Sequence, residues 1–199
     1  MKIGITPSVR ETYKKQYEFS IDVKLISFLR YCFPRSKISI ITEISSNISN
    51  IDLLIISGGN DLYNIKKNES NLLRNKLDKK ILSIAIKKKI TLIGFCYGAQ
   101  FISQFFNNRL IKIKNHVRKI NKIFLKNNKF LNKDTIKVKC FHNYAVKSYK
   151  NFEKLGFCTD GSLEFYKVKK KKLFGIMWHP ERNLNLKKLN KSIIKNICS

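Results

Sequence analysis

Short apolar runs alternate with longer amphipathic segments in the first half of the chain. The runs have the length of single strands, and they are residues 2–6, 37–41, 51–57 and 90–95. The longer segments repeat apolar residues at helical spacing, and they are residues 18–33, 70–88 and 97–106. This alternation predicts a parallel sheet with helices packed against it. The runs at 51–57 and 90–95 predict strands buried on both faces.

The first predicted helix ends before Pro34, because proline cannot continue a helix. Its inward positions are predicted from the spacing to be Phe19, Val23, Ile26, Leu29 and Phe33. The lysine-rich helix at 70–88 is predicted to turn its apolar residues inward, namely Leu72, Leu73, Leu77, Ile81, Leu82 and Ile84.

The pattern changes after residue 108. Residues 135–141 alternate apolar and polar side chains, and residues 152–159 and 163–169 predict two strands joined by the turn "DGS". A last strand is predicted at 173–178 and a closing helix at 184–197. We therefore expect an α/β fold whose parallel half is followed by a more antiparallel half. Because no Pro-, Gly- or Ser-rich linker divides the chain, residues 1–199 are interpreted as one domain.

The chain is strongly basic, with 41 Lys and Arg residues against 13 Asp and Glu residues and a formal net charge of +28. Such a charge attracts anions. The lysines are spread along the chain without an arginine-rich stripe, so an anionic small molecule is favoured over nucleic acid as the partner. No apolar run has the length of a membrane span or a signal-peptide core, and the five cysteines are scattered. We therefore expect a cytoplasmic protein without a membrane partner.

The stretch "LIGFCYGAQFISQFF" (92–106) places Cys96 between Gly94 and Gly98, where a strand is predicted to become a helix. Reactive groups gather at the carboxyl ends of strands in open α/β sheets, and a Gly-x-Cys-x-Gly turn is the thiol counterpart of a nucleophile elbow. The helix N-terminus favours the thiolate, and the N–H of Tyr97 is placed to become an oxyanion donor. The alternative is that Cys96 is a small buried packing residue.

A thiolate nucleophile needs a base, and the base needs an acceptor that orients it. His179 stands in "GIMWHPER" directly after an apolar strand, with Glu181 two positions on. Residues two apart on an extended backbone point the same way, and Pro180 prevents a helix there. Glu181 can therefore accept from one imidazole nitrogen while the other faces Cys96. His116 has no such context and is predicted to be structural.

No Cys-x-x-Cys, His-x-His or His-Glu-x-x-His spacing occurs, and the Gly58-Gly59 turn is too short for a phosphate loop. The sequence therefore predicts neither a metal site nor a cofactor. The remaining cysteines are interpreted as packing residues or incidental thiols, and they are Cys32, Cys140, Cys158 and Cys198.

The segments "GFCYGAQ" and "WHPE", about eighty residues apart and preceded by "LLIISGGND", resemble the class I glutamine amidotransferase superfamily. That superfamily includes the γ-glutamyl hydrolases, and the resemblance covers nearly the whole chain. It implies a flavodoxin-like, mostly parallel sheet flanked by helices. It also implies that Cys96, His179 and Glu181 form a catalytic triad. Such a triad attacks a γ-glutamyl amide and releases glutamate through a thioester.

The same resemblance implies how the substrate is held. The Gly58-Gly59 turn resembles the second oxyanion contributor, which pairs the N–H of Gly59 with that of Tyr97. The segment "CFHNYAV" (140–146) resembles a Ser-x-His-x-Gln type sequence that lines the glutamyl site, although Asn143 and Tyr144 replace the usual polar pair. The implied substrate-binding residues are Gly58, Asn60, Gln100, His142, Asn143 and Tyr144.

The turn "ISGGND" and the opening "IGITPSVRE" resemble the γ-glutamyl hydrolase branch more than the histidine-pathway glutaminases, whose turn usually contains Pro-Gly. The short length and "FHNY" resemble small hydrolases that cleave γ-glutamyl-CDP-amidate in bacterial capsule phosphoramidate synthesis. Cations predicted near strand ends could meet the phosphates, and they are Arg10, Lys14, Lys15, Lys66 and Lys67. Two alternatives remain open. The chain could be a glutaminase subunit that supplies ammonia to a synthase partner, or a non-catalytic basic protein that binds nucleic acid.

Overall fold

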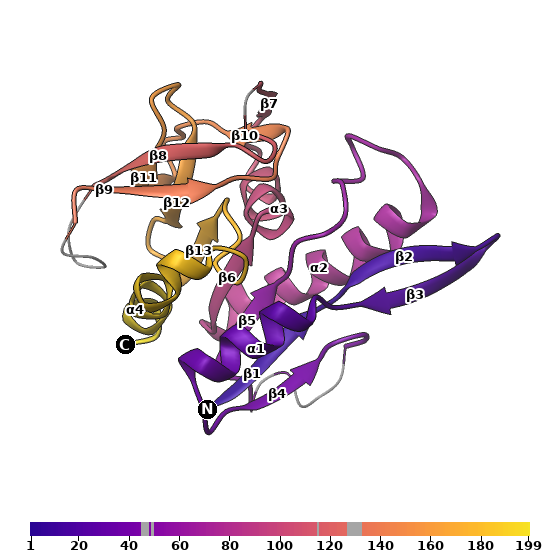
Figure 1. Cartoon of the computed structure of the whole chain (residues 1–199). Helices are drawn as coiled ribbons and strands as arrows, with labels where there is room; N and C mark the ends of the chain where they lie inside the picture. The colour runs from indigo at the N-terminus through magenta and orange to yellow at the C-terminus, as the bar shows by residue number, and fades with distance from the viewer. Residues whose placement is uncertain (45–47, 49, 115, 127–132) are drawn as a thin grey trace.

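The computed structural model describes residues 1–44, 48, 50–114, 116–126 and 133–199 (Figure 1). Five neighbouring strands of the large sheet are parallel to one another, in the spatial order β4, β1, β5, β6, β13. Their bounds are Lys37–Ile40 for β4, Lys2–Thr6 for β1, Leu53–Ile56 for β5, Thr91–Phe95 for β6 and Leu173–Ile176 for β13. All of these strands were predicted, and their carboxyl ends meet at one edge of the sheet.

The sheet continues beyond β13 with antiparallel strands in the order β12, β11, β8, β9. Their bounds are Leu163–Val168 for β12, Phe152–Phe157 for β11, Ile120–Leu125 for β8 and Thr135–Lys139 for β9. The short strands β7 (Leu110–Lys112) and β10 (Tyr144–Val146) pair with each other, and β10 also pairs with β12. The predicted α/β class, with a parallel half followed by an antiparallel half, is confirmed.

Helices cover both faces of the parallel half. On one face lie α1 (Val23–Cys32) and α4 (Lys187–Cys198), and on the other lie α2 (Glu69–Lys88) and α3 (Tyr97–Phe105). A short 3₁₀ turn, η2 (Leu184–Leu186), precedes α4. Alternate residues of β5 enter the two cores, with Ile55 facing the α1 side and Leu54 the α2 side. Among the described residues, no helix combines the length and apolar character that crossing a bilayer requires.

The start of the first helix differs from the prediction. A hairpin of β2 (Ser8–Tyr13) and β3 (Gln16–Ser20) occupies this stretch and projects beyond the sheet (Figure 1). Asp22 then caps α1, because its carboxylate accepts from the N–H of Lys24 at 2.9 Å. Phe19 and Val23 are 52% and 75% exposed instead of buried. The buried face of α1 consists of Leu25, Phe28, Leu29 and Cys32.

Two glycines let α3 begin directly at the end of β6. A Cβ on Gly94 would lie 2.5 Å from the carbonyl oxygen of Gly98, and a Cβ on Gly98 would lie 2.2 Å from the carbonyl oxygen of Ile56. Both approaches involve backbone atoms, which cannot rotate away as a side chain can. The Gly-x-Cys-x-Gly spacing is therefore required by the contact of α3 with β5 and β6.

We expect Gly98→Ala to destabilise the fold despite its location in a helix. Glycine-to-alanine changes in helices stabilise by about 0.5–1 kcal/mol, whereas overpacking a core costs about 1–3 kcal/mol. The contact with Ile56 makes the second effect larger here. The measurement is the free energy of unfolding in urea, with Ser83→Ala on the exposed side of α2 as the control. A Gly98→Ala protein as stable as wild type would contradict the close packing of α3.

Candidate active site

Cys96 lies in the turn between β6 and α3, with φ 50° and ψ −100°. Non-glycine residues rarely adopt positive φ, and the conformation is kept by hydrogen bonds on both sides. The N–H of Cys96 donates to the carbonyl of Ile176 in β13 at 2.8 Å, and its carbonyl accepts from the N–H of Gln100 at 3.0 Å. The thiol is half-buried. The turn thus presents the sulfur at the carboxyl edge of the sheet, immediately before the first residue of α3.

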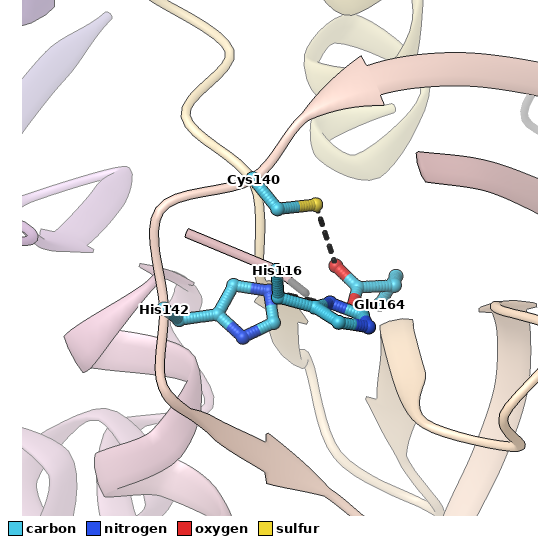
Figure 2. A group of neighbouring side chains, drawn as sticks. All are labelled: His116, Cys140, His142 and Glu164. Carbon is cyan, nitrogen blue, oxygen red and sulfur yellow. Dashed lines mark hydrogen bonds and ion pairs between the residues drawn. The ribbon is translucent and has the colours of Figure 1, made fainter. Parts of the chain in front are cut away.

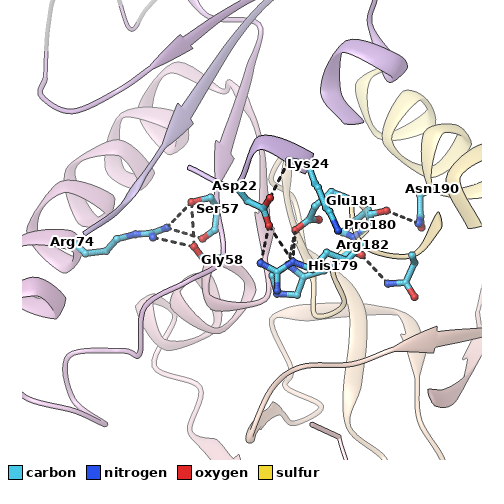
Figure 3. Close-up of polar contacts among 11 residues, drawn as sticks. Asp22, Lys24, Ser57, Gly58, Arg74, His179, Pro180, Glu181, Arg182 and Asn190 are labelled. Carbon is cyan, nitrogen blue, oxygen red and sulfur yellow. Dashed lines mark hydrogen bonds and ion pairs between the residues drawn. The ribbon is translucent and has the colours of Figure 1, made fainter. Parts of the chain in front are cut away.

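His179 and Glu181 follow β13, the strand beside β6, so that sheet pairing brings them to Cys96. The Nδ1 atom of His179 lies 2.6 Å from Oε1 of Glu181, and both side chains are buried (Figure 3). The imidazole lies beside the Cys96 thiol, and the two groups interact electrostatically. The carboxylate is the acceptor for an N–H at Nδ1, which leaves Nε2 for the sulfur.

The backbone that carries His179 is tied down by amide side chains. The Nδ2 atom of Asn183 donates to the carbonyl of His179 at 2.8 Å, and that of Asn190, in α4, donates to the carbonyl of Pro180 at 3.2 Å. Oδ1 of Asn190 also accepts from Nε1 of the buried Trp178 at 3.2 Å. The imidazole is thereby held in place from α4 and from β13.

The charges of Cys96 and His179 depend on each other. Burial alone raises the pKa of the Cys96 thiol, but the positive charge of the adjacent His179 outweighs burial, and the pKa is lowered. Burial alone lowers the pKa of His179, whereas the Cys96 thiolate and Glu181 raise it to about 10. The arrangement therefore favours a thiolate beside an imidazolium, which is the reactive form of a cysteine nucleophile.

The Gly58-Gly59 turn follows β5 and adjoins both of these residues. A Cβ on Gly58 would lie 2.7 Å from Cε1 of His179 and 3.7 Å from Cβ of Cys96. Gly59 has φ 123°, a conformation that glycine alone adopts readily. The turn can approach Cys96 this closely only because a side chain is absent at Gly58.

Arg74, in α2, orients this turn, and the sequence patterns did not indicate it. Its guanidinium is fully buried and pairs with Asp78 at 2.9 Å. It also donates to the carbonyls of Ser57 at 2.6 Å and Gly58 at 3.2 Å (Figure 3). The described peptide bonds are trans, so the N–H of Gly59 points away from the Gly58 carbonyl and hence away from Arg74. The burial of an arginine within a helix can be recognised only from its contacts in the folded chain.

Arg74 also touches the residue that carries the other predicted oxyanion donor. Its guanidinium lies over the ring of the buried Tyr97, 4.3 Å from the ring centroid. Tyr97 is the first residue of α3, so its N–H belongs to the open end of the helix. The pairing of the Gly59 and Tyr97 N–H groups as an oxyanion hole stays a prediction.

The residues predicted to hold the substrate differ in their burial and in their hydrogen bonds. Gln100 and His142 are buried and meet at one backbone oxygen, the carbonyl of Tyr144, at 3.0 Å from Nε2 of Gln100 and 3.1 Å from Nδ1 of His142. Asn143 is exposed. The side-chain amide of Asn60 is occupied within the protein, because it exchanges hydrogen bonds with the backbone of Val9 at 2.8 and 2.9 Å.

A second group of chemically active side chains lies beside the site, and the sequence patterns did not reveal it. His116, Cys140, His142 and Glu164 converge from separate segments, and all four are buried (Figure 2). Their ligand atoms lie within 4.8 Å of one another, so they could hold a metal ion. No spacing signal could have found them, because these side chains meet only in the folded chain.

Comparison with known proteins identifies the family. The family described as Glutamine amidotransferase class-I matches residues 17–197, and the chain therefore belongs to it. The chain is 34% identical to the "Gamma-glutamyl-CDP-amidate hydrolase" of Campylobacter jejuni over 137 residues, which cover 68% of this chain and 65% of that protein. It is 28% identical to a glutamine-hydrolysing GMP synthase subunit of Methanococcus aeolicus over 178 residues, 85% of this chain and 86% of that protein.

The fold is shared with solved structures as well. A crystal structure of a glutamine amidotransferase from Thermotoga maritima superposes with a TM-score of 0.75 at 13% sequence identity, covering 100% of this chain and 98% of that one. At 13% sequence identity, this similarity shows a shared fold and nothing about function. The suspected superfamily and its sheet are thus confirmed.

We expect the alkylation rate of Cys96 to report its lowered pKa. Because the thiolate is the reactive form, the rate at which iodoacetamide labels Cys96 should reach half of its maximum at a pH below the usual thiol pKa. His179→Asn should raise this midpoint, because the variant lacks the positive charge that lowers the pKa of the Cys96 thiol against the effect of burial. Rates are measured against pH by mass spectrometry of the labelled peptides. Cys198, whose pKa burial raises to about 11, is the internal control. Equal midpoints for the two cysteines would contradict the ion pair.

Proposed function

We propose that this class-I glutamine amidotransferase hydrolyses a γ-glutamyl amide bond within one catalytic domain, residues 1–199. Cys96 is the nucleophile, His179 is the base and acid, and Glu181 orients the imidazole. The observation that carries the proposal is the His179–Glu181 pair, joined at 2.6 Å, beside the Cys96 thiol with which the imidazole interacts electrostatically. This is the arrangement that cysteine nucleophiles require.

In the proposed reaction, the Cys96 thiolate attacks the γ-carbonyl carbon, and negative charge develops on the carbonyl oxygen. The N–H groups of Gly59 and Tyr97 stabilise that oxygen. The C–N bond then breaks as His179 gives its proton to the leaving nitrogen, which leaves a glutamyl thioester on Cys96. Water attacks the thioester, His179 takes the proton of that water, and L-glutamate departs from the regenerated thiolate.

The best-supported specific substrate is γ-glutamyl-CDP-amidate, which would yield glutamate and cytidine diphosphoramidate for capsular phosphoramidate synthesis in the cytoplasm. Support comes from the 34% identity to the Campylobacter jejuni protein of that name. It also comes from cations on the β2–β3 hairpin, whose Val9 is hydrogen-bonded to Asn60 of the turn: Arg10, next to Val9 and opposite Glu18, is exposed. Lys14 and Lys15 lie at the exposed hairpin tip. These cations suit a diphosphate leaving group, whereas L-glutamine has none.

The second candidate is a glutaminase subunit that passes ammonia to a synthase. The observation that favours it is the similarity to the glutamine-hydrolysing GMP synthase subunit of Methanococcus aeolicus, which extends over 85% of this chain. The two candidates share the chemistry of Cys96 and differ in the leaving group and in the need for a partner.

We expect the purified chain to release glutamate rapidly from γ-glutamyl-CDP-amidate and only slowly from L-glutamine. Cys96→Ala should abolish turnover while leaving substrate binding largely intact, because the thiol makes the bond that is broken later. Glutamate is measured by a coupled assay and binding by calorimetry, with Cys32→Ser as a control for a buried thiol far from the site. Turnover by Cys96→Ala would refute the proposed nucleophile. Negligible release from every γ-glutamyl amide would favour the subunit that waits for a synthase.

Arg74→Lys is expected to lower kcat about 10- to 100-fold with a much smaller change in KM, because an oxyanion donor acts mainly in the transition state. Lysine keeps the charge beside Asp78 but cannot hold both carbonyls of the turn. Steady-state kinetics are compared with those of Arg30→Lys, on the exposed side of α1, and thermal melting shows whether the variants remain folded. A folded Arg74→Lys protein with normal kcat would show that Arg74 does not position the turn.

A further inference from the structure

The buried group beside the active site is built from segments that are far apart in the sequence. His116 lies between β7 and β8, Cys140 follows β9, His142 precedes β10, and Glu164 lies in β12. Their exposed fractions are 4%, 0%, 3% and 0%. Figure 2 shows the four side chains directed toward one another. Two imidazoles, a thiol and a carboxylate are ligands that zinc accepts.

Three distances from Glu164 to the other members fall in the range found between neighbouring ligands of a tetrahedral site, and all the ligand atoms lie within 4.8 Å of one another. Nε2 of His142 and Nδ1 of His116 lie 3.3 and 3.5 Å from Oε1 of Glu164, and Sγ of Cys140 lies 3.8 Å from Oε2. With zinc–ligand bonds of about 2.0–2.3 Å, neighbouring corners of a tetrahedron are about 3.3–3.8 Å apart. Small movements of these side chains would therefore complete the coordination.

The outer nitrogen of each imidazole already has an acceptor. Nε2 of His116 lies 3.0 Å from Oδ2 of Asp160, and Nδ1 of His142 lies 3.1 Å from the carbonyl of Tyr144. Metal-bound histidines usually donate their second N–H to a carboxylate or a backbone carbonyl in this way. With those protons placed outside, the inner nitrogens of both neutral rings carry lone pairs.

Those lone pairs face a carboxylate oxygen that is itself an acceptor. Within the described residues, Nδ1 of His116, Nε2 of His142 and Oε1 of Glu164 are buried without a hydrogen-bond partner. Burial of converging acceptors is unfavourable unless a positive charge lies between them. Protons could supply it, but two imidazolium rings with centroids 5.0 Å apart would then repel each other.

We infer that His116, Cys140, His142 and Glu164 form a structural zinc site. Binding displaces the thiol proton of Cys140 to solvent, and the metal then neutralises the thiolate and the carboxylate together. A polar cavity of about 230 Å³ adjoins the group, and its lining includes His116, Cys158 and Asp160 together with Lys114 and Lys122. The site would also fix the position of His142, whose neighbour Phe141 packs against His179. The inference does not depend on the proposed hydrolase reaction.

The test is the zinc content of the full chain, expressed in zinc-supplemented medium, freed of loosely bound metal by gel filtration with a weak chelator, and measured by mass spectrometry. We expect near-stoichiometric zinc in the wild type and a loss of most of it in Cys140→Ser and Glu164→Gln. Asp160→Ala should weaken zinc binding about 10- to 100-fold, because it removes the acceptor behind His116. Circular dichroism confirms that each variant is folded.

Three cysteine variants are matched controls. Cys32→Ser changes a distant buried thiol, Cys96→Ser changes the active-site thiol, and Cys158→Ser changes the thiol that lies with His116 and Asp160 in an alternative grouping. All three should retain zinc. Zinc absent from the wild type would overturn the inference, and so would zinc lost on changing Cys96 or Cys158 but kept on changing Cys140.

A measurement on the wild type alone protects the test against variants that do not fold. X-ray absorption at the zinc edge should show one sulfur and three nitrogen or oxygen neighbours. A shell without sulfur, or with two sulfurs, would contradict this ligand set.

Discussion

The strained backbone of Cys96 is the constraint on which the other features of the site depend. A positive φ costs a non-glycine residue on the order of 1–3 kcal/mol, and it persists only where the surroundings enforce it. Here α3 packs directly on β5 and β6 through Gly98, and the N–H of Cys96 is bonded to Ile176 of β13. Because β13 is the strand that leads to His179, the bond that holds the turn also fixes where the imidazole arrives.

The interactions that shape this site are a few buried charges, not the large net charge of the chain. Arg74 is buried with Asp78, and the guanidinium directs its remaining donors to the carbonyls of Ser57 and Gly58. A buried ion pair is costly to desolvate and adds little stability unless its remaining hydrogen bonds are made. In this protein those bonds run to the turn beside Cys96. The Arg74–Asp78 pair therefore serves mainly to fix the orientation of the peptide group after Gly58, and it contributes little to stability.

The segment 140–144 connects the active site with the inferred zinc site. Phe141 packs edge-on against His179, with ring centroids 5.7 Å apart. His142, the next residue, belongs to the buried group. The carbonyl of Tyr144 accepts from both His142 and Gln100. A metal that holds Cys140 and His142 would thus determine the position of this wall of the active site.

Features that depend on residues close together in the chain could be predicted from the sequence. Apolar runs indicated β5 and β6, and the spacing of Gly94, Cys96 and Gly98 indicated the turn between β6 and α3. The same local patterns can also mislead. The end of β3 is predicted to belong to the helix, because Phe19 and Val23 fit a helical period, although the helix begins only after its cap, Asp22.

The contacts between distant side chains became visible only in the folded molecule. Arg74 reaches the carbonyl of Gly58 across 16 positions, and Cys140 reaches Glu164 across 24. Periodicity and turn chemistry act between neighbours along the chain, so they carry no information about such pairs. Strand order and helix packing bring these segments together, and for that reason the buried arginine and the inferred zinc ligands depend on the tertiary structure.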